Sequence, residues 1–418
     1  MSESVESTPT LLRVAMRVRE ANMAMVLLCA ISIAIVLGGL LIIFTTPLLT
    51  ASWGGFFSHP GGTITLTLRT VWYAYEMIFQ GSVINFHATN VLLHHWSTEN
   101  FSTFITPLAG TLSYATPLIV AGLGLAIGFR SGLFDIGGRG QIIGGGMAAA
   151  WVGFTFNFTP VVEISLEIVA AIIVGGLLGG FAGVLKAYTG AHEVIVTMMT
   201  NYIVVLVMGY LLIQPLFAQP GILDGLSKTI NPSAQLPEFL SHISTTLYFN
   251  FGFVFAIVAV FGTQWFFDRS KTGFELLAVG RNAEAARTAG INVRRSTIVT
   301  LALAGGVLGL SGMMQVAGVD HHISPTFGGS YGFDAITVAL LGRNRPWGVF
   351  FGAIFFGAMA TGGHIMQAVT PTNIDYSLAQ VIQAVVVFCV ATPALIIEMF
   401  KLREPARRAA VNAQGAAA

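Results

Sequence analysis

Charged side chains are scarce in this chain of 418 residues. Lys, Arg, Asp and Glu together make up 9% of the sequence, whereas hydrophobic residues make up 54%. A soluble domain carries about 25% charged residues, so this chain could not cover a soluble surface of its size. The composition excludes an intrinsically disordered chain, and a formal net charge of +1 excludes a basic nucleic-acid-binding module. We expect an all-α polytopic protein embedded in the lipid bilayer.

Cysteines and catalytic motifs are also scarce. Cys29 and Cys389 are the two cysteines, and both lie within apolar runs, which excludes a disulfide scaffold. No lysine follows a glycine, so the chain lacks the phosphate-binding loop of an ATPase. His192-Glu193 is not followed by a second histidine at the spacing that a zinc protease needs. We therefore expect no catalytic site, no metal site and no cofactor in this chain.

Long apolar runs, in contrast, are abundant. A transmembrane helix needs about 20 apolar residues. Nine runs are long enough, and they lie near residues 22–46, 104–129, 138–158, 164–186, 193–213, 247–267, 295–317, 346–366 and 377–400. Two of them carry glycines at four-residue spacing, Gly175-Gly179-Gly183 and Gly305-Gly309, which let helix backbones approach closely.

Basic residues predict how these spans are oriented. If the N-terminal tail 1–21 is cytoplasmic and the spans alternate, every Lys and Arg of the chain except Arg69 and Lys228 falls on the cytoplasmic side. The transmembrane domain 22–400 is then followed by a C-terminal tail, 401–418, that is also cytoplasmic. Both ends inside require an even number of crossings, so we expect about ten.

The segment 319–342 must supply the tenth crossing. Its first part is rich in Gly, Ser and Pro, and the apolar run 333–341 is too short to span the bilayer alone. Broken helices of this kind mark substrate paths in transporters. The alternative is a long external loop followed by a short helix.

Two segments outside the spans are long. The external segment 47–103 is moderately apolar near 63–83, where we expect a helix that lies in the membrane interface. The cytoplasmic loop 268–294 is the longest on its side. We expect its first helix to end at Gly280 and a second helix, capped by Asn282, to end at Gly290. Two short capped helices would form a rigid projection that can transmit force from a docked partner.

A polar stripe interrupts the span near 193–213. Glu193, Thr197, Thr200 and Asn201 share one helical face, which either binds a neighbouring helix or lines a path. A second break lies at 132–141, where Asp135 and Arg139 could pair on one helical face. One interpretation is a charge pair near the membrane interior, and the other is a cytoplasmic turn with a local ion pair. The candidate path residues are Phe134, Asp135, Glu193, Thr197, Asn201, Phe327, Phe333 and Asp334.

Four ordered motifs resemble permeases of ATP-binding-cassette (ABC) importers, in the branched-chain amino acid and simple-sugar permease family. They are Gly132-Leu133-Phe134-Asp135-Ile136-Gly137 with Gly140-Gln141, Glu193-Val194-Ile195 with Asn201-Tyr202-Ile203, the loop from Gly273 to Ile291, and Tyr331-Gly332-Phe333-Asp334 with the following residues to Arg343. The similarity runs in order from about 105 to 398 and is strongest to the nucleoside branch of the family.

The resemblance implies a membrane-spanning subunit that forms the substrate path but has no ATPase site of its own. It implies a separate cytoplasmic ABC ATPase, a second permease subunit that is usually a paralogue, and an external substrate-binding protein or lipoprotein. It implies residence in the bacterial inner membrane and a nucleoside as substrate, with ribose or a similar sugar as the nearest alternative. The residues that would couple to the ATPase are Gly280, Arg281, Asn282, Glu284, Ala285, Ala286, Arg287 and Gly290.

The sequence also departs from the family. Asp135 stands where the family commonly has Asn, and Arg139 where it has Glu, a swap that could keep a local charge pair. His192 and Ala283 are further departures. A secondary transporter driven by an ion gradient remains an alternative, but its titratable groups would be Asp135, Glu193 and Asp334, all near predicted span ends.

Overall fold

The computed structural model describes residues 23–221, 225–239, 249–369 and 374–391. The predicted tails 1–21 and 401–418 lie outside these ranges. Within them the chain is helical and forms no strand beyond two isolated bridges, Ala218 with Ser227 and Glu238 with Asn250. The all-α class is therefore confirmed.

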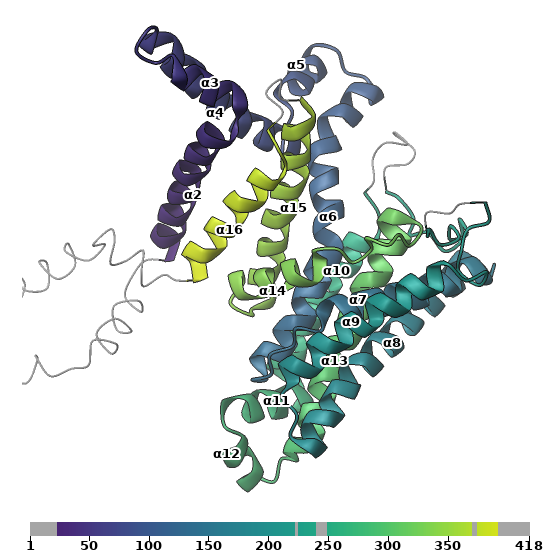
Figure 1. Ribbon diagram of the computed structural model, residues 1–418. Helices are drawn as coiled ribbons and strands as arrows, with labels where there is room; N and C mark the ends of the chain where they lie inside the picture. Colours follow the sequence, from purple (N-terminus) through teal and green to yellow (C-terminus); the bar gives the residue numbers. More distant parts are fainter. Residues whose placement is uncertain (1–22, 222–224, 240–248, 370–373, 392–418) are drawn as a thin grey trace, which may run out of the picture. The chain divides into compact units, whose positions relative to one another are not determined.

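Figure 1 shows the helices in chain order. They are α2 (Met23–Thr45), α3 (Pro47–Gly54), α4 (Pro60–Ser82), α5 (Phe86–His94), α6 (Thr98–Arg130), α7 (Gly138–Thr155), α8 (Pro160–Thr189), α9 (Glu193–Leu212), α10 (Gly252–Arg269), α11 (Lys271–Arg281), α12 (Ala283–Thr288), α13 (Val293–Gln315), the π-helical turn η1 (Val316–Asp320), α14 (Tyr331–Leu341), α15 (Pro346–Val369) and α16 (Ser377–Ala391).

Each of the nine predicted spans overlaps a helix in the described ranges, and residues 22, 247–248 and 392–400 of three of these spans lie outside those ranges. Five helices are long and apolar enough to cross a membrane: α6, α8, α9, α13 together with η1, and α15. A sixth span arises if Ser32–Thr45 and Pro47–Gly54, which meet at 74°, count as one. Ten crossings and cytoplasmic ends stay predictions.

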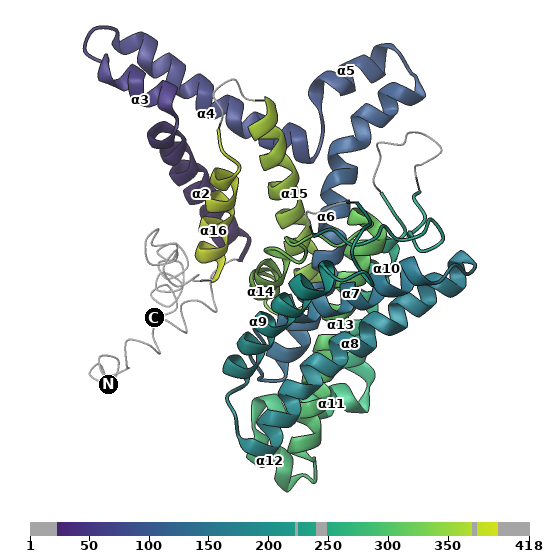
Figure 2. The same ribbon diagram turned by 45° about the vertical axis from the view of Figure 1, so that its right-hand side comes forward.

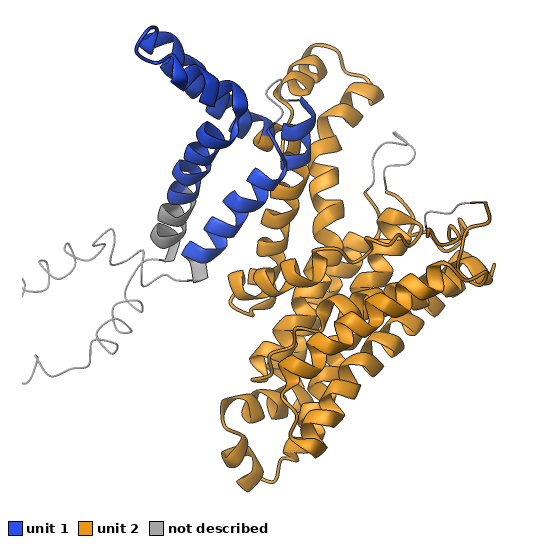
Figure 3. Ribbon diagram, in the orientation of Figure 1, with its two compact units in different colours: residues 1–77, 363–418 blue, residues 78–362 orange. Residues whose placement is uncertain are grey.

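The chain divides into two compact units, which are coloured in Figure 3. Unit 1 comprises residues 1–77 and 363–418, and unit 2 comprises residues 78–362. In unit 1, α2 packs against α16. The Tyr75 hydroxyl of α4 donates a 2.6 Å hydrogen bond to the carbonyl oxygen of Ile35 in α2.

Unit 2 is built around α13, which packs against α8, α7 and α6 (Figure 2). The predicted glycine ridges lie at the contact of α8 with α13. A Cβ atom on Gly175 would overlap the carbonyl oxygen of Gly305, and one on Gly183 would lie 2.9 Å from the Cα of Ile298. The two backbones therefore touch along three turns, a distance that residues with side chains could not reach.

The predicted break at 319–342 is present. The helix α13 continues through η1 and ends at Asp320, and His321 with a φ of 57° then turns the chain away from the helical path. Residues 321–330 are irregular, with turns at 325–330, and α14 then provides a half-helix of 11 residues. Gly332 at its start lies against the backbone of Arg139, so this half-helix packs on the start of α7.

The segment 47–103 contains more helix than expected. The predicted interfacial helix near 63–83 corresponds to α4, but α3 and α5 also form, and α6 begins at Thr98, six residues before the predicted span. The prediction missed these short helices because they have no long apolar run.

Candidate functional site

The polar stripe of α9 faces the 131–137 connection, which joins α6 to α7. Asn201 makes two hydrogen bonds there: its Nδ2 donates to the carbonyl oxygen of Ile136 at 2.7 Å, and its Oδ1 accepts from the amide of Gly140 at 2.8 Å. The first amides of a helix lack partners within that helix. Gly137 at the N-cap has no side chain to bind them, so Asn201 caps α7 from a neighbouring helix.

Asp135 occupies the same buried cluster. Its side chain is fully buried, and its carboxylate accepts from the amide of Gly137 at 2.7 Å and from Nε2 of Gln141 at 3.0 Å. Burial raises the pKa of this carboxyl above its ordinary value, and the two hydrogen bonds oppose the rise. The predicted Asp135–Arg139 pair is absent from the described contacts, because α7 begins at Gly138 and the two residues share no helical face.

Thr197 and Glu193 complete the stripe. Thr197 is 1% exposed, and its hydroxyl accepts from the amide of Ile136 at 3.3 Å. Glu193 forms a 2.6 Å ion pair with Lys186 of α8. The stripe therefore joins α9 to the 131–137 connection and to α8 in this structure, and its contact with a substrate stays a prediction.

The candidate aromatic residues differ in exposure. Phe134 is 42% exposed and stacks on Phe129, with ring centroids 4.8 Å apart. Phe333 is 53% exposed, and the carboxylate of Asp334 beside it accepts a 2.6 Å hydrogen bond from Ser330. Phe327 is 2% exposed and lies against Gly146 of α7, so it presents no ring to a path in this conformation.

The cytoplasmic loop forms two helices, α11 and α12, which we call the coupling hairpin (residues 271–288). The side chain of Asn282 accepts hydrogen bonds from the amides of Glu284 and Ala285, which confirms the predicted cap. The predicted helix end at Gly280 is wrong, because α11 continues to Arg281. Gly290 has a φ of 82° just beyond α12, where glycine is favoured.

Gly280 has a different role from the predicted one. A Cβ atom on Gly280 would lie 2.5 Å from the carbonyl carbon of Ser131, and one on Gly132 would lie 3.0 Å from the Cα of Gly280. The coupling hairpin thus touches the 131–137 connection backbone to backbone. The same connection is held by Asn201 and Thr197, so the hairpin and α9 bind one short segment from two sides.

The outer face of the hairpin carries charges. Arg281, Glu284 and Arg287 are exposed, and Arg287 lies 3.6 Å from Glu284. Ala285 is exposed, whereas Ala286 is only 4% exposed and its carbonyl oxygen accepts from the amide of Ile291. Ala286 was expected to face a partner, but it packs inside the hairpin.

Two buried acids in α8 were missed by the sequence analysis. Glu163 and Glu167 are fully buried. The Glu163 carboxylate accepts one 3.2 Å hydrogen bond from the amide of Phe158, whereas both carboxyl oxygens of Glu167 lack a partner in the described part of the chain. Their four-residue spacing within an apolar run is a signal that could have found them.

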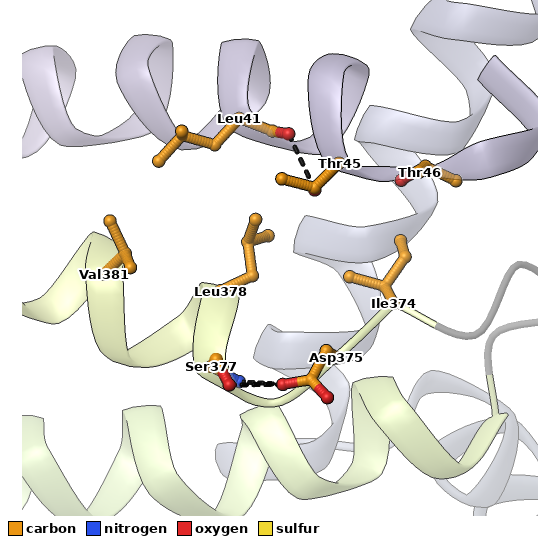
Figure 4. A pocket seen from close by; sticks show the side chains of 8 residues that line it. All are labelled: Leu41, Thr45, Thr46, Ile374, Asp375, Ser377, Leu378 and Val381. Carbon is orange, nitrogen blue, oxygen red and sulfur yellow. Dashed lines mark hydrogen bonds between the residues drawn. The ribbon is translucent and has the colours of Figure 1, made fainter. Parts of the chain in front are cut away.

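A hollow in unit 1 lies between α2 and α16 and has a volume of about 270 Å³ (Figure 4). Leu41, Leu378 and Val381 give it apolar walls, and Asp375 lies at one end. Hydrogen bonds from the amide and hydroxyl of Ser377 hold the pKa of the Asp375 carboxyl below its ordinary value. The described residues contain no group of three or more His, Cys, Asp or Glu that could hold a metal ion.

Comparison with known proteins decides among the interpretations of this helical bundle. Residues 108–391 match the family described as the permease component of branched-chain amino acid transport systems. The chain belongs to this permease family. The match begins within α6 and ends with α16, so it includes the stripe, the coupling hairpin and the broken segment.

Named relatives of this permease transport different substrates. It is 34% identical to the guanosine ABC transporter permease protein NupP of Bacillus subtilis, over 70% of this chain and 84% of that protein. It is 31% identical to the nucleoside permease NupB of Lactococcus lactis, over 68% of this chain and 79% of that protein. It is 30% identical to the glucose permease TsgB13 of Haloferax volcanii, over 68% of this chain and 76% of that protein. No solved structure matches the chain significantly.

Proposed function

We propose that this permease is one of two membrane subunits of an ABC importer that carries nucleosides across the bacterial inner membrane. A separate ATPase would supply the energy, an external binding protein would deliver the substrate, and the second subunit would be a paralogue of this chain. The similarity to NupP and NupB supports a nucleoside substrate.

The contact of Gly280 with Ser131 is the observation that supports coupling. The exposed face of the hairpin is available to an ATPase, and its inner face lies on the 131–137 connection. Movement of the hairpin would therefore displace the backbone of this connection directly. The connection is bound to the side chains of Asn201 and Thr197 of α9, so the displacement would reach the polar stripe through these hydrogen bonds.

Uptake measurements test the proposal. Cells that express the complete importer should accumulate radiolabelled guanosine, and deletion of this permease should abolish that accumulation. An ATPase variant unable to hydrolyse ATP should abolish it equally. Uptake that persists with the inactive ATPase but collapses with an ionophore would contradict an ATP-driven importer and favour a secondary transporter.

A sugar is the second candidate substrate, because the glucose permease TsgB13 is nearly as similar as the nucleoside permeases. Uptake of ribose and glucose should be measured in the same strains. If deletion of this permease abolishes sugar uptake but leaves guanosine uptake unchanged, the nucleoside assignment is rejected. The assignment as an ABC importer is then kept. A thermal-shift screen of the partner binding protein provides an independent measure of substrate preference.

A further inference from the structure

Unit 2 contains a basic hollow that the proposed transport cycle does not use. It has a volume of about 560 Å³ and lies where α6 and α10 end and α15 begins. Its lining residues are Arg130, Gln264, Arg345, Pro346, Trp347 and Gly348. This end of unit 2 also carries the coupling hairpin, because α11 follows α10 after one residue.

The two guanidinium groups of the hollow have no anionic partner at hydrogen-bonding distance in the described part of the chain. Arg130 is half-buried and lies over the ring of Phe267, 4.1 Å from its centroid. Asp268 is the nearby carboxylate, and Gln264 already donates a hydrogen bond to it. Arg345 and Arg281 add positive charge around Arg130. The local charge therefore stays positive and favours an anion.

The start of α15 adds neutral donors to these charges. The amide of Val349 bonds to the carbonyl oxygen of Arg345, so the amides of Trp347 and Gly348 belong to the first turn, which lacks partners within the helix. Such amides and the helix dipole favour negative charge. Two guanidinium groups beside a helix start suit a phosphate group, to which arginine can bind through two parallel hydrogen bonds.

The surroundings of the hollow distinguish a lipid phosphate from a soluble one. The ring of Trp347 meets that of Phe261 edge to face, with centroids 5.1 Å apart. Phe261, Trp265 and Phe351 are 57%, 63% and 65% exposed on the adjoining surfaces of α10 and α15. An apolar surface that begins beside a phosphate site suits acyl chains below a headgroup, and tryptophan is enriched at this level of a membrane.

We propose that this hollow binds the phosphate of an acidic phospholipid headgroup, with the acyl chains lying against α10 and α15. Basic pockets between helices bind such headgroups in other membrane proteins. Because the site adjoins the coupling hairpin, the bound lipid would hold the ends of α6, α10 and α15 together beside the ATPase docking surface.

Native mass spectrometry of the intact importer can test the proposal. Complexes with Arg130→Gln, Arg345→Gln or both changes would be titrated with phosphatidylglycerol and with phosphatidylcholine. Loss of a charged hydrogen bond predicts about tenfold weaker phosphatidylglycerol binding for each single variant. Arg269→Gln is the matched control, because Arg269 ends α10, which contributes Gln264 to the hollow, but does not itself line the hollow. It should bind as the wild type does.

Four outcomes would overturn the proposal. The first is equal phosphatidylglycerol binding by the double variant and the Arg269→Gln control. The second is equal binding of phosphatidylcholine and phosphatidylglycerol by the wild type. The third is displacement of the lipid by inorganic phosphate or ATP, which would assign the site to a soluble phosphate. The fourth is loss of ATPase binding by Arg345→Gln with lipid binding unchanged. Arg130→Lys keeps the charge and should retain part of the affinity, which separates a binding defect from misfolding.

Discussion

Replacement of Asn201 by alanine tests whether the polar stripe of α9 stabilises the fold or contacts the substrate. The change removes both hydrogen bonds to the 131–137 connection and the start of α7. The amide of Gly140 is buried and would lose its partner, which costs about 1–3 kcal/mol of folding free energy. The carbonyl oxygen of Ile136 is only partly buried, so water can replace part of its bond. We expect a destabilisation of about 1–3 kcal/mol in total.

Thr200→Val provides the matched control on the same face of α9. Within the described part of the chain, the hydroxyl of Thr200 bonds only to the carbonyl oxygen of Val196 in its own helix, so its loss should change stability by less than about 0.5 kcal/mol. Thermal unfolding of the purified importer would measure both variants, and guanosine uptake would be followed in parallel. If Asn201→Ala unfolds like the wild type but raises the KM for uptake, Asn201 contacts the substrate and the capping argument is refuted.

Three further changes test the coupling hairpin and the buried acids. Gly280→Ala should impair uptake and ATPase stimulation, because its Cβ would collide with Ser131. Gly262→Ala is the control and should not impair them, because a Cβ at Gly262 would enter open space. Equal activity of the two variants would contradict the contact between Gly280 and Ser131. Ala286→Trp should lower the melting temperature because Ala286 is buried, whereas Ala285→Trp on the exposed face should preserve stability but weaken ATPase pull-down. Glu167→Gln should keep or raise the melting temperature, because a fully buried carboxyl without a partner in the described residues gains no stability from its charge. A marked drop in the melting temperature would instead indicate that Glu167 binds an ion.

The sequence predicted features that depend on local patterns. Apolar length located nine helices, and the capping rule placed Asn282 correctly at the start of α12. Small-residue spacing also identified Gly175 and Gly305 as points where two helix backbones approach closely, because such an approach leaves few other residues possible.

Features that depend on distant contacts were predicted less well. The helix end assigned to Gly280 followed a valid rule for glycine, but here the residue is required by the approach of Ser131, which is distant in sequence. Spacing offered Arg139 as a possible partner of Asp135, whose partners are Gly137 and Gln141. Likewise, spacing left open whether Asn201 binds a neighbouring helix or lines a path, and it did not indicate that α7 begins without a cap of its own.

The glycine contact between α8 and α13 also limits how this permease can change during evolution. An α-helix turns by about 100° per residue, so one inserted residue in α8 would rotate every later glycine away from α13. Leu178 would then take the place of Gly179 and face a backbone that leaves no space for a Cβ atom. An insertion in one helix therefore needs a compensating change in the other. Among homologues, length variation should be confined to the connections and to segments such as 47–103, while α8 and α13 keep a fixed register.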